Sequence, residues 1–161
     1  MKPQEIKQNV FELIGSDWCL IGACKDQHYN MMCASWGGFG VLWNKEVATI
    51  YIRPQRYTKE FVDDSEYFTL SFFEEEYREI LSIMGSKSGR DIDKENYAGI
   101  TGIIKEGVVY FKEAKLTIKC KKIYQDTLKP ECFLDDSIEH NYPKKDYHDM
   151  YIGEILEVIK Q

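Results

Sequence analysis

The sequence has few basic residues and few histidines, and each shortage excludes a class of protein. Among 161 residues, 21 are lysine or arginine and 27 are aspartate or glutamate, which gives a net charge of −6. A nucleic-acid-binding protein needs a broad basic face to displace counterions, so we expect no nucleic-acid partner. The three histidines are scattered without paired spacing, and we therefore predict no metal site.

Long apolar runs and paired cysteines are also missing. No run approaches the roughly 18 apolar residues of a membrane-spanning helix, and no charged-then-apolar leader begins the sequence. The five cysteines are odd in number and never form a Cys-x-x-Cys pair. These absences predict a cytoplasmic protein that has free thiols and no membrane partner.

The residues that are present favour strands. Aromatic residues make up 14% of the chain, and they fit the pleated surface of a sheet. Apolar and β-branched runs predict strands at 17–26, 30–36, 46–52, 66–73 and 150–159. Apolar residues at helical spacing predict helices at 3–14 and 74–85, and a shorter helix at 57–65. The length favours one domain over residues 1–161.

The segment 101–126 is predicted to form one hairpin that turns at Glu106-Gly107. Its second arm alternates apolar and polar residues, as a half-buried antiparallel strand does, and the phase slips near Lys122, which predicts a bulge. Residues 127–146 are expected to form a long loop. Because strands outnumber helices and connections are short, we predict an antiparallel barrel or sandwich with a few peripheral helices.

The stretch "TIYIRPQRYT" at residues 49–58 concentrates arginine in a chain that has only four. Pro54 fixes the backbone where the strand ends, and Arg53 and Arg56 are close enough across the turn to converge on one anion. Thr58 adds a hydroxyl group. Pairing of each arginine with Glu60 or another nearby acid explains the pattern equally well, and spacing alone leaves both interpretations open.

A second basic stretch is "GSKSGRDIDK" at residues 85–94. Ser88 is a good N-cap for a predicted helix, Gly89 leaves backbone amides accessible, and Lys87, Arg90 and Lys94 crowd the same region. An ordinary capped helix with local ion pairs is the alternative. Because the two stretches hold three of the four arginines, we expect them to share an anion site.

Two further groups of residues are candidates for chemistry. The strand "NMMCASW" at residues 30–36 is expected to offer amide, thiol, hydroxyl and indole groups on one face, which suits a flat heteroaromatic ligand as well as it suits a core. His148 in "DYHDMYIGEI" is the candidate proton carrier near neutral pH, although a lone histidine beside a strand is more often structural.

These motifs occur in an order that resembles the flavin reductase-like family, which includes the flavoredoxins. The resemblance covers about residues 10–159 and rests on five stretches: N-x-M-x-x-S-W at 30–36, RPQRYT at 53–58, YFTLSFF at 67–73, SGRDIDK at 88–94 and H-x-M-Y-I-G-E-I at 148–155. It implies a mainly β fold, a six-stranded antiparallel Greek-key split β-barrel with a few peripheral helices. It also implies a homodimer with FMN near the interface.

The resemblance further implies where FMN would lie. The phosphate would meet the turn of Arg53, Pro54, Gln55, Arg56 and Thr58, and its seat would be completed by Ser88, Gly89, Arg90 and Lys94. The flavin ring would lie along Asn30, Met31, Met32, Cys33, Ala34, Ser35 and Trp36. Cys33 departs from the family pattern, which commonly has threonine, and a thiol is the poorer hydrogen-bond partner.

Three functions are compatible with this resemblance. The first is an FMN-binding oxidoreductase, an NAD(P)H-dependent flavin reductase in which His148 lines the nicotinamide side. The second is a flavoredoxin-like electron carrier that holds FMN tightly and takes electrons from a redox protein. The third is a barrel that binds a phosphate ligand without redox work.

Overall fold

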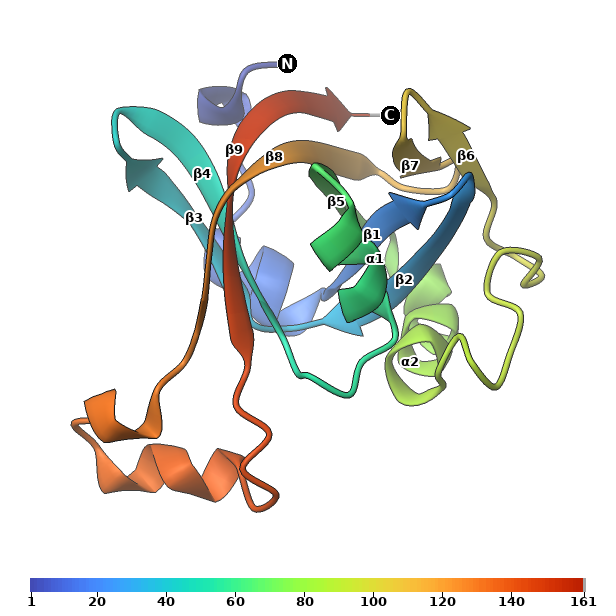
Figure 1. Ribbon diagram of the computed structural model, residues 1–161. Coiled ribbons are helices and arrows are strands. Elements are labelled where there is room, and N and C mark those ends of the chain that lie inside the picture. Colours follow the sequence, from blue (N-terminus) through green and yellow to red (C-terminus); the bar gives the residue numbers. More distant parts are fainter. Residues whose placement is uncertain (161) are drawn as a thin grey trace.

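A computed structural model describes residues 1–160 and contains a seven-stranded antiparallel sheet (Figure 1). The strand order is β2-β1-β5-β8-β9-β4-β3, and β6 and β7 form a separate hairpin. The strands are β1 Cys19–Lys25, β2 His28–Ala34, β3 Gly37–Leu42, β4 Lys45–Ile52, β5 Tyr67–Phe72, β6 Gly102–Lys105, β7 Val108–Phe111, β8 Leu116–Thr127 and β9 Asp149–Lys160.

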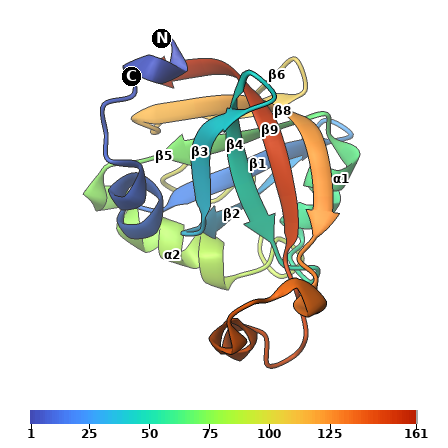
Figure 2. The same cartoon turned by 90° about the vertical axis from the view of Figure 1, so that its left-hand side faces the viewer.

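The helices are short and lie around the sheet (Figures 1 and 2). They are α1 Thr58–Asp64, α2 Arg78–Ser86, the π-helical turn η2 Glu12–Ser16 and the 3-10 turns η1 Pro3–Glu5, η3 Glu75–Tyr77, η4 Pro130–Cys132 and η5 Asp136–Asn141. In residues 1–160, none of these helices has the length and apolar character that spanning a membrane requires.

The sheet buries both of its faces, because β1 contributes side chains to two separate apolar clusters. Ile21 belongs to the first cluster, inside the curved sheet, together with Phe68 and Phe72. Leu20 belongs to the second, which lies under α2 and the β6–β7 hairpin and includes Leu81. Burial on both faces explains why β1 reads as a continuous apolar run without the alternation of a half-exposed strand.

Most of the predicted elements are confirmed. The strands expected at 17–26, 46–52, 66–73 and 150–159 correspond to β1, β4, β5 and β9, and α1 and α2 match two of the predicted helices. The bulge predicted near Lys122 is also present, since the β8–β9 register shifts between Lys119 and Cys120 and again between Lys122 and Tyr124. The sheet holds seven strands where the resemblance implied six, and β3 pairs only with β4 at its edge.

The predicted hairpin at 101–126 is confirmed around its turn, where β6 pairs with β7, and is wrong beyond Phe111. Glu106 and Gly107 both have positive φ, as a tight two-residue turn requires, and they join β6 to β7. The arm then stops at Phe111, where the N–H of Ala114 donates to the Phe111 carbonyl and reverses the chain. β8 therefore pairs with β5 and β9 instead of continuing β7.

Three other local predictions need correction. The helix expected at 3–14 is two short turns, η1 and η2, and the loop expected at 127–146 contains η4 and η5. No helix begins at Ser88, because its hydroxyl accepts the N–H of Arg90 two residues later. Such a local side-chain bond competes with a helix. Lys94 instead extends to carbonyls of β2 and α2.

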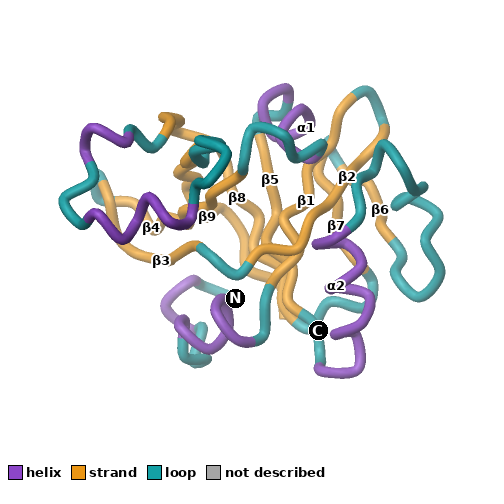
Figure 3. Tube along the Cα trace, turned by 90° about the horizontal axis from the view of Figure 1, so that it is seen from below, coloured by secondary structure: helices purple, strands orange, loops and turns teal. Residues whose placement is uncertain are grey.

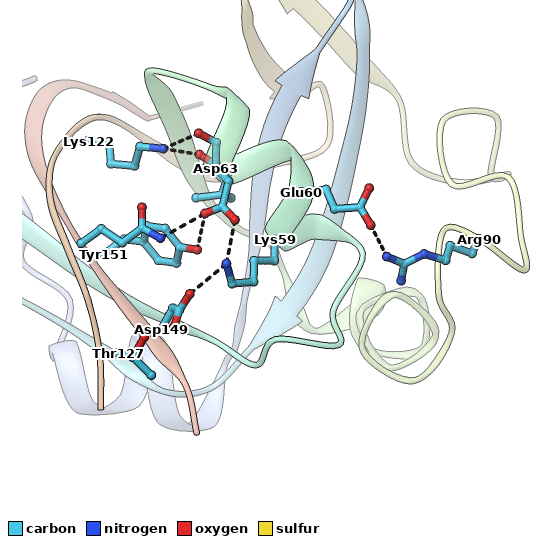
Figure 4. Close-up of polar contacts among 10 residues, drawn as sticks. Lys59, Glu60, Asp63, Arg90, Lys122, Thr127, Asp149 and Tyr151 are labelled. Carbon is cyan, nitrogen blue, oxygen red and sulfur yellow. Dashed lines mark hydrogen bonds and ion pairs between the residues drawn. The ribbon is translucent and has the colours of Figure 1, made fainter. Parts of the chain in front are cut away.

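A polar network fixes α1 against β8 and β9 (Figure 4). Lys59 Nζ contacts Asp63 at 2.6 Å and Asp149 at 2.8 Å, and the Tyr151 hydroxyl donates to Asp63 at 2.7 Å. Burial opposes the charge on Lys59, but hydrogen bonds to Asp149 and Asp63 leave its pKa above the ordinary value. Lys122 adds bonds to the Val62 and Asp63 carbonyls. These contacts hold α1 against β8 and β9.

Gly153 in β9 lies close to side chains of β5 and β8, and a substitution there tests this packing. A Cβ there would lie 2.6 Å from Phe68 and 2.7 Å from Cys120, so Gly153→Ala should lower the free energy of unfolding by roughly 1–3 kcal/mol. Gly40→Ala in β3 is the matched control, because nothing lies within 4 Å of its added Cβ. Urea denaturation of both variants measures the difference, and equal stabilities would contradict this packing.

Candidate functional site

The turn between β4 and α1 bridges two parts of the molecule that lie on opposite sides of it (Figure 3). The Arg56 N–H donates to the Arg53 carbonyl at 3.1 Å and closes the turn. The Arg56 guanidinium donates to the Gly85 carbonyl of α2 at 2.7 Å. The Arg53 guanidinium instead reaches the segment 127–148, which connects β8 to β9. The two arginines of one turn therefore face different surroundings.

Arg56 is half-buried and has no carboxylate partner in the described chain. Its one hydrogen bond goes to a carbonyl oxygen, which offers partial charge only. Burial lowers the pKa of its guanidinium, and the positive charge of Arg53 lowers it further. A desolvated cation without a compensating anion is unfavourable, so this position favours the arrival of an anionic ligand.

Lys94 is a second buried cation without an acidic partner among residues 1–160. It is only 4% exposed, and its Nζ donates to the Met31 carbonyl at 2.8 Å and the Met84 carbonyl at 2.9 Å. Because an ammonium group has three N–H donors, one remains for a ligand. Burial lowers the pKa of Lys94 to about 8, and the nearby charge of Arg56 acts in the same direction.

Asn30, Thr58 and Gly89 shape the space beside these cations. The Asn30 amide donates to the Thr58 hydroxyl at 2.9 Å, and both side chains are buried. A Cβ at position 89 would lie 2.5 Å from the Asn30 side-chain oxygen and 2.9 Å from the Tyr57 ring. Glycine is therefore required here for the 88–94 segment to approach β2 and the turn.

These groups line one cavity of about 220 Å³, which we call the cationic cavity. It brings together residues from three predicted motifs that are far apart in sequence. Its lining residues are Asn30, Met32, Gln55, Arg56, Tyr57, Thr58, Ser86, Lys87, Ser88, Gly89, Asp91 and Lys94.

Arg53, Pro54 and Arg90 do not line the cationic cavity. Arg53 pairs with Asp146 at 2.8 Å and lies 5.0 Å from the centre of the Tyr142 ring. Arg90 pairs with Glu60 (Figure 4) and lies 4.5 Å from the centre of the Tyr57 ring. Arg53 and Arg90 therefore each pair with an acid, as the alternative interpretation expected. Glu60, however, was expected to pair with Arg53 or Arg56, and it pairs with Arg90.

A second cavity of about 200 Å³, which we call the aromatic cavity, lies beside the first and shares Met32 with it. Its lining residues are Met32, Cys33, Ala34, Ser35, Trp36, Tyr51, Arg53 and His148. Arg53 is neutralised by Asp146. The aromatic cavity therefore has flat walls and little net charge.

The prediction that residues 30–36 share one functional face is wrong. Successive residues of a strand point to opposite faces, so Asn30 and Met32 lie on one side of β2 while Met31 and Cys33 lie on the other. Met31 contributes its carbonyl to Lys94 and buries its side chain under α2. Trp36 lies beyond the end of β2.

His148 is buried beside the aromatic cavity and lies between two aromatic rings. Its Nδ1 is 2.8 Å from the Tyr142 hydroxyl, and its ring centre is 5.1 Å from that of Trp36. Burial lowers the pKa of His148 to about 4, and the charge of Arg53 contributes. The imidazole is therefore neutral at pH 7, and its catalytic role stays a prediction.

Cys33 is a thiol, not a thiolate, at neutral pH. Burial raises the pKa of Cys33 to about 11, although Arg78, Arg56 and Lys94 oppose the change. Within residues 1–160, no cluster of three or more histidine, cysteine or acidic side chains has the geometry to hold a metal ion. The chemistry available to these residues is therefore anion binding, ring stacking and hydrogen bonding.

Sequence reasoning missed Tyr57, Tyr142 and Asp146. Tyr57 was read only as part of a short helix, and the other two lie in the segment that was expected to be a plain loop. No periodic pattern distinguishes them, because their contacts with Arg90, His148 and Arg53 depend on how the chain folds. The stretch "DYHD" at residues 146–149, which contains Asp146 and His148, gives no signal of these contacts.

The family of this chain follows from its sequence match. The flavin reductase like domain matches residues 12–160. The chain belongs to the flavin reductase-like family. No curated protein matches the chain.

Solved structures share the split-barrel fold. An FMN-binding protein from Thermus thermophilus has a TM-score of 0.73 at 18% identity, with 100% of this chain and 81% of that chain covered. Flavoredoxin of Desulfovibrio vulgaris has a TM-score of 0.71 at 22% identity, with coverage of 100% and 77%. A putative flavin reductase with a split-barrel domain, from Shewanella frigidimarina, has a TM-score of 0.70 at 18% identity and coverage of 98% and 75%. The predicted antiparallel split β-barrel with a few helices is confirmed.

The lowered pKa of Lys94 predicts a pH dependence of stability. Above pH 8 the native state releases the Lys94 proton while the unfolded chain keeps it up to its ordinary pKa near 10. The free energy of unfolding should therefore rise between about pH 8 and 10, by on the order of 2 kcal/mol, relative to a Lys94→Met variant. Urea denaturation at several pH values measures this difference, and parallel pH profiles would contradict it.

Proposed function

We propose that this protein is an FMN-binding oxidoreductase that reduces flavin with NAD(P)H. The observation that carries the proposal is the pair of half-buried Arg56 and buried Lys94, two cations without acidic partners that line one cavity. The family match and the fold shared with FMN-binding proteins name the ligand. A flavin phosphate would supply the missing negative charge.

The residues of the cationic cavity fit a phosphate group. Arg56 and Lys94 each have N–H donors left after their bonds to carbonyls. The Thr58 hydroxyl accepts from Asn30 and keeps its own proton for a ligand. Gly89 allows the 88–94 segment to pack against Asn30 and Tyr57 at the wall of the cavity. Of the predicted phosphate contacts, we keep Arg56, Thr58, Ser88, Gly89 and Lys94, and assign Arg53 and Arg90 to holding the turn and the 88–94 segment.

The aromatic cavity would take the reacting part of the nicotinamide. When bound, FMN supplies the hydride chemistry that these side chains lack. The chain itself would bind and orient: Trp36 and Tyr51 offer flat surfaces, and His148 offers a neutral imidazole. A Streptomyces globisporus NADH:FAD oxidoreductase shares the fold at a TM-score of 0.67 and 11% identity, over 90% of this chain and 74% of that one. This supports a nicotinamide donor.

Arg56→Ala tests the phosphate contact. Loss of a charge-assisted hydrogen bond should weaken FMN binding roughly 10- to 150-fold and leave riboflavin, which lacks the phosphate, nearly unchanged. Titration of flavin fluorescence measures both affinities. Arg90→Ala is the matched control, because Arg90 belongs to the other basic stretch but pairs with Glu60 outside the cavity. Equal losses for FMN and riboflavin would make Arg56 structural.

Turnover separates the proposed reductase from its alternatives. With added FMN, we expect the protein to oxidise NADH or NADPH, measured as loss of absorbance of the reduced nicotinamide. Tightly held FMN without turnover would indicate a flavoredoxin-like carrier that is served by a redox protein. A colourless protein that takes up no FMN would leave only the non-redox phosphate-binding barrel.

The homodimer is a separate prediction, which light scattering of the purified protein tests.

A further inference from the structure

The aromatic cavity contains a histidine whose two ring nitrogens have different surroundings. Nδ1 of His148 meets the Tyr142 hydroxyl at 2.8 Å. Nε2 has no hydrogen-bond partner among the described residues. It is nevertheless not fully buried, because Asp146 Oδ1 is the only fully buried side-chain atom of the described residues that lacks a partner. Part of Nε2 is therefore accessible, and the cavity that His148 lines is the aromatic cavity.

The direction of the Tyr142–His148 bond decides which nitrogen carries the proton. Burial raises the pKa of Tyr142, so the phenol keeps its proton. Among the described residues, Nδ1 of His148 is the only acceptor within reach of that proton. Since a neutral imidazole has one donor and one acceptor nitrogen, Nδ1 accepts from Tyr142 and Nε2 carries the hydrogen.

The surroundings of His148 support a neutral donor rather than a proton carrier. The charged groups near it are Arg53 and Asp146, which pair with each other at 2.8 Å, and its other polar neighbours are Tyr142, Tyr51 and Trp36. The cavity of about 200 Å³ is smaller than the roughly 300–1,000 Å³ of sites for drug-sized ligands. It suits a single flat, uncharged ring that bears a hydrogen-bond acceptor.

We propose that Tyr142 is a positioning residue that holds His148 in the tautomer with hydrogen on Nε2, so that this N–H donates to the carbonyl oxygen of a flat, uncharged ring in the aromatic cavity. The carboxamide-bearing ring of a reduced nicotinamide belongs to this class. The identity of that ligand rests on the proposed function, whereas the tautomer does not.

Nitrogen NMR of the flavin-free protein at pH 7 tests the tautomer directly. The chain has three histidines, and His28 and His140 are exposed, so a His148→Gln variant identifies the His148 signals. We expect the wild type to show hydrogen on Nε2, and Tyr142→Phe, which removes only the hydroxyl, to show a mixture of tautomers. An unchanged spectrum in Tyr142→Phe would overturn the proposal.

Tyr147→Phe is the matched control for that spectrum. Tyr147 lies in the same aromatic cluster, with its ring centre 5.0 Å from that of Tyr142, but its hydroxyl donates to Glu139. Removal of this hydroxyl should leave the His148 tautomer as it is. A shift as large as that of Tyr142→Phe would mean that general loosening of the cluster, and not the hydroxyl, sets the tautomer.

Kinetics test the role of the tautomer with the full protein and FMN. Tyr142→Phe should raise the KM for the reduced nicotinamide roughly 3- to 10-fold, as expected for a lost neutral hydrogen bond, while the Kd for FMN stays constant. In a His148→Gln background, whose amide nitrogen can donate from the position of Nε2, Tyr142→Phe should cause no further loss. Additive losses, or an FMN affinity that falls with the KM effect, would contradict the proposal.

The outcomes separate this inference from the proposed function. If the protein takes up no FMN or oxidises no nicotinamide, the proposed function fails, and the NMR result still decides the tautomer. If turnover is present and Tyr142→Phe changes neither the spectrum nor the KM, the inference fails alone.

Discussion

The desolvation of two cations, Arg56 and Lys94, is the constraint around which the cationic cavity is arranged. Neither side chain meets a carboxylate in the described chain, and each gives its hydrogen bonds to main-chain carbonyls of β2 or α2. Carbonyl dipoles keep the groups solvated but do not cancel their charge, so both pKa values fall. An anion that reached both groups would compensate their charge.

The electrostatic difference between the two cavities comes from a single ion pair. Arg53 and Arg56 leave the same turn, but Asp146 neutralises Arg53 and nothing comparable approaches Arg56. The cationic cavity is therefore suited to a phosphate, and the aromatic cavity to an uncharged ring. Met32 lines both, so the two cavities adjoin each other along β2.

The segment 127–148 takes part in the aromatic cavity rather than only connecting β8 to β9. It supplies Asp146 to Arg53, and the rings of Phe133, Tyr142 and Tyr147 pack against one another within it. This packing places the Tyr142 hydroxyl at His148. A segment that reads as a polar loop in the sequence thus sets the charge of one cavity wall and the hydrogen-bonding state of its histidine.

The sequence by itself determined most of the strands, α1 and α2, and the bulge in β8, because periodicity and turn chemistry are local properties. It also grouped Arg56, Thr58, Ser88, Gly89 and Lys94, through the order of the motifs. It did not predict β3. It could not determine that the hairpin ends at Phe111, that Asn30 and Cys33 lie on opposite faces of a doubly buried strand, or which arginine is neutralised. Those features depend on contacts that no local pattern predicts: the carbonyls that receive Arg56 and Lys94, the carboxylate that meets Arg53, and the Tyr142 hydroxyl that meets His148. Only tertiary structure brings these groups within hydrogen-bonding distance, and that distance decides which charges remain for a ligand.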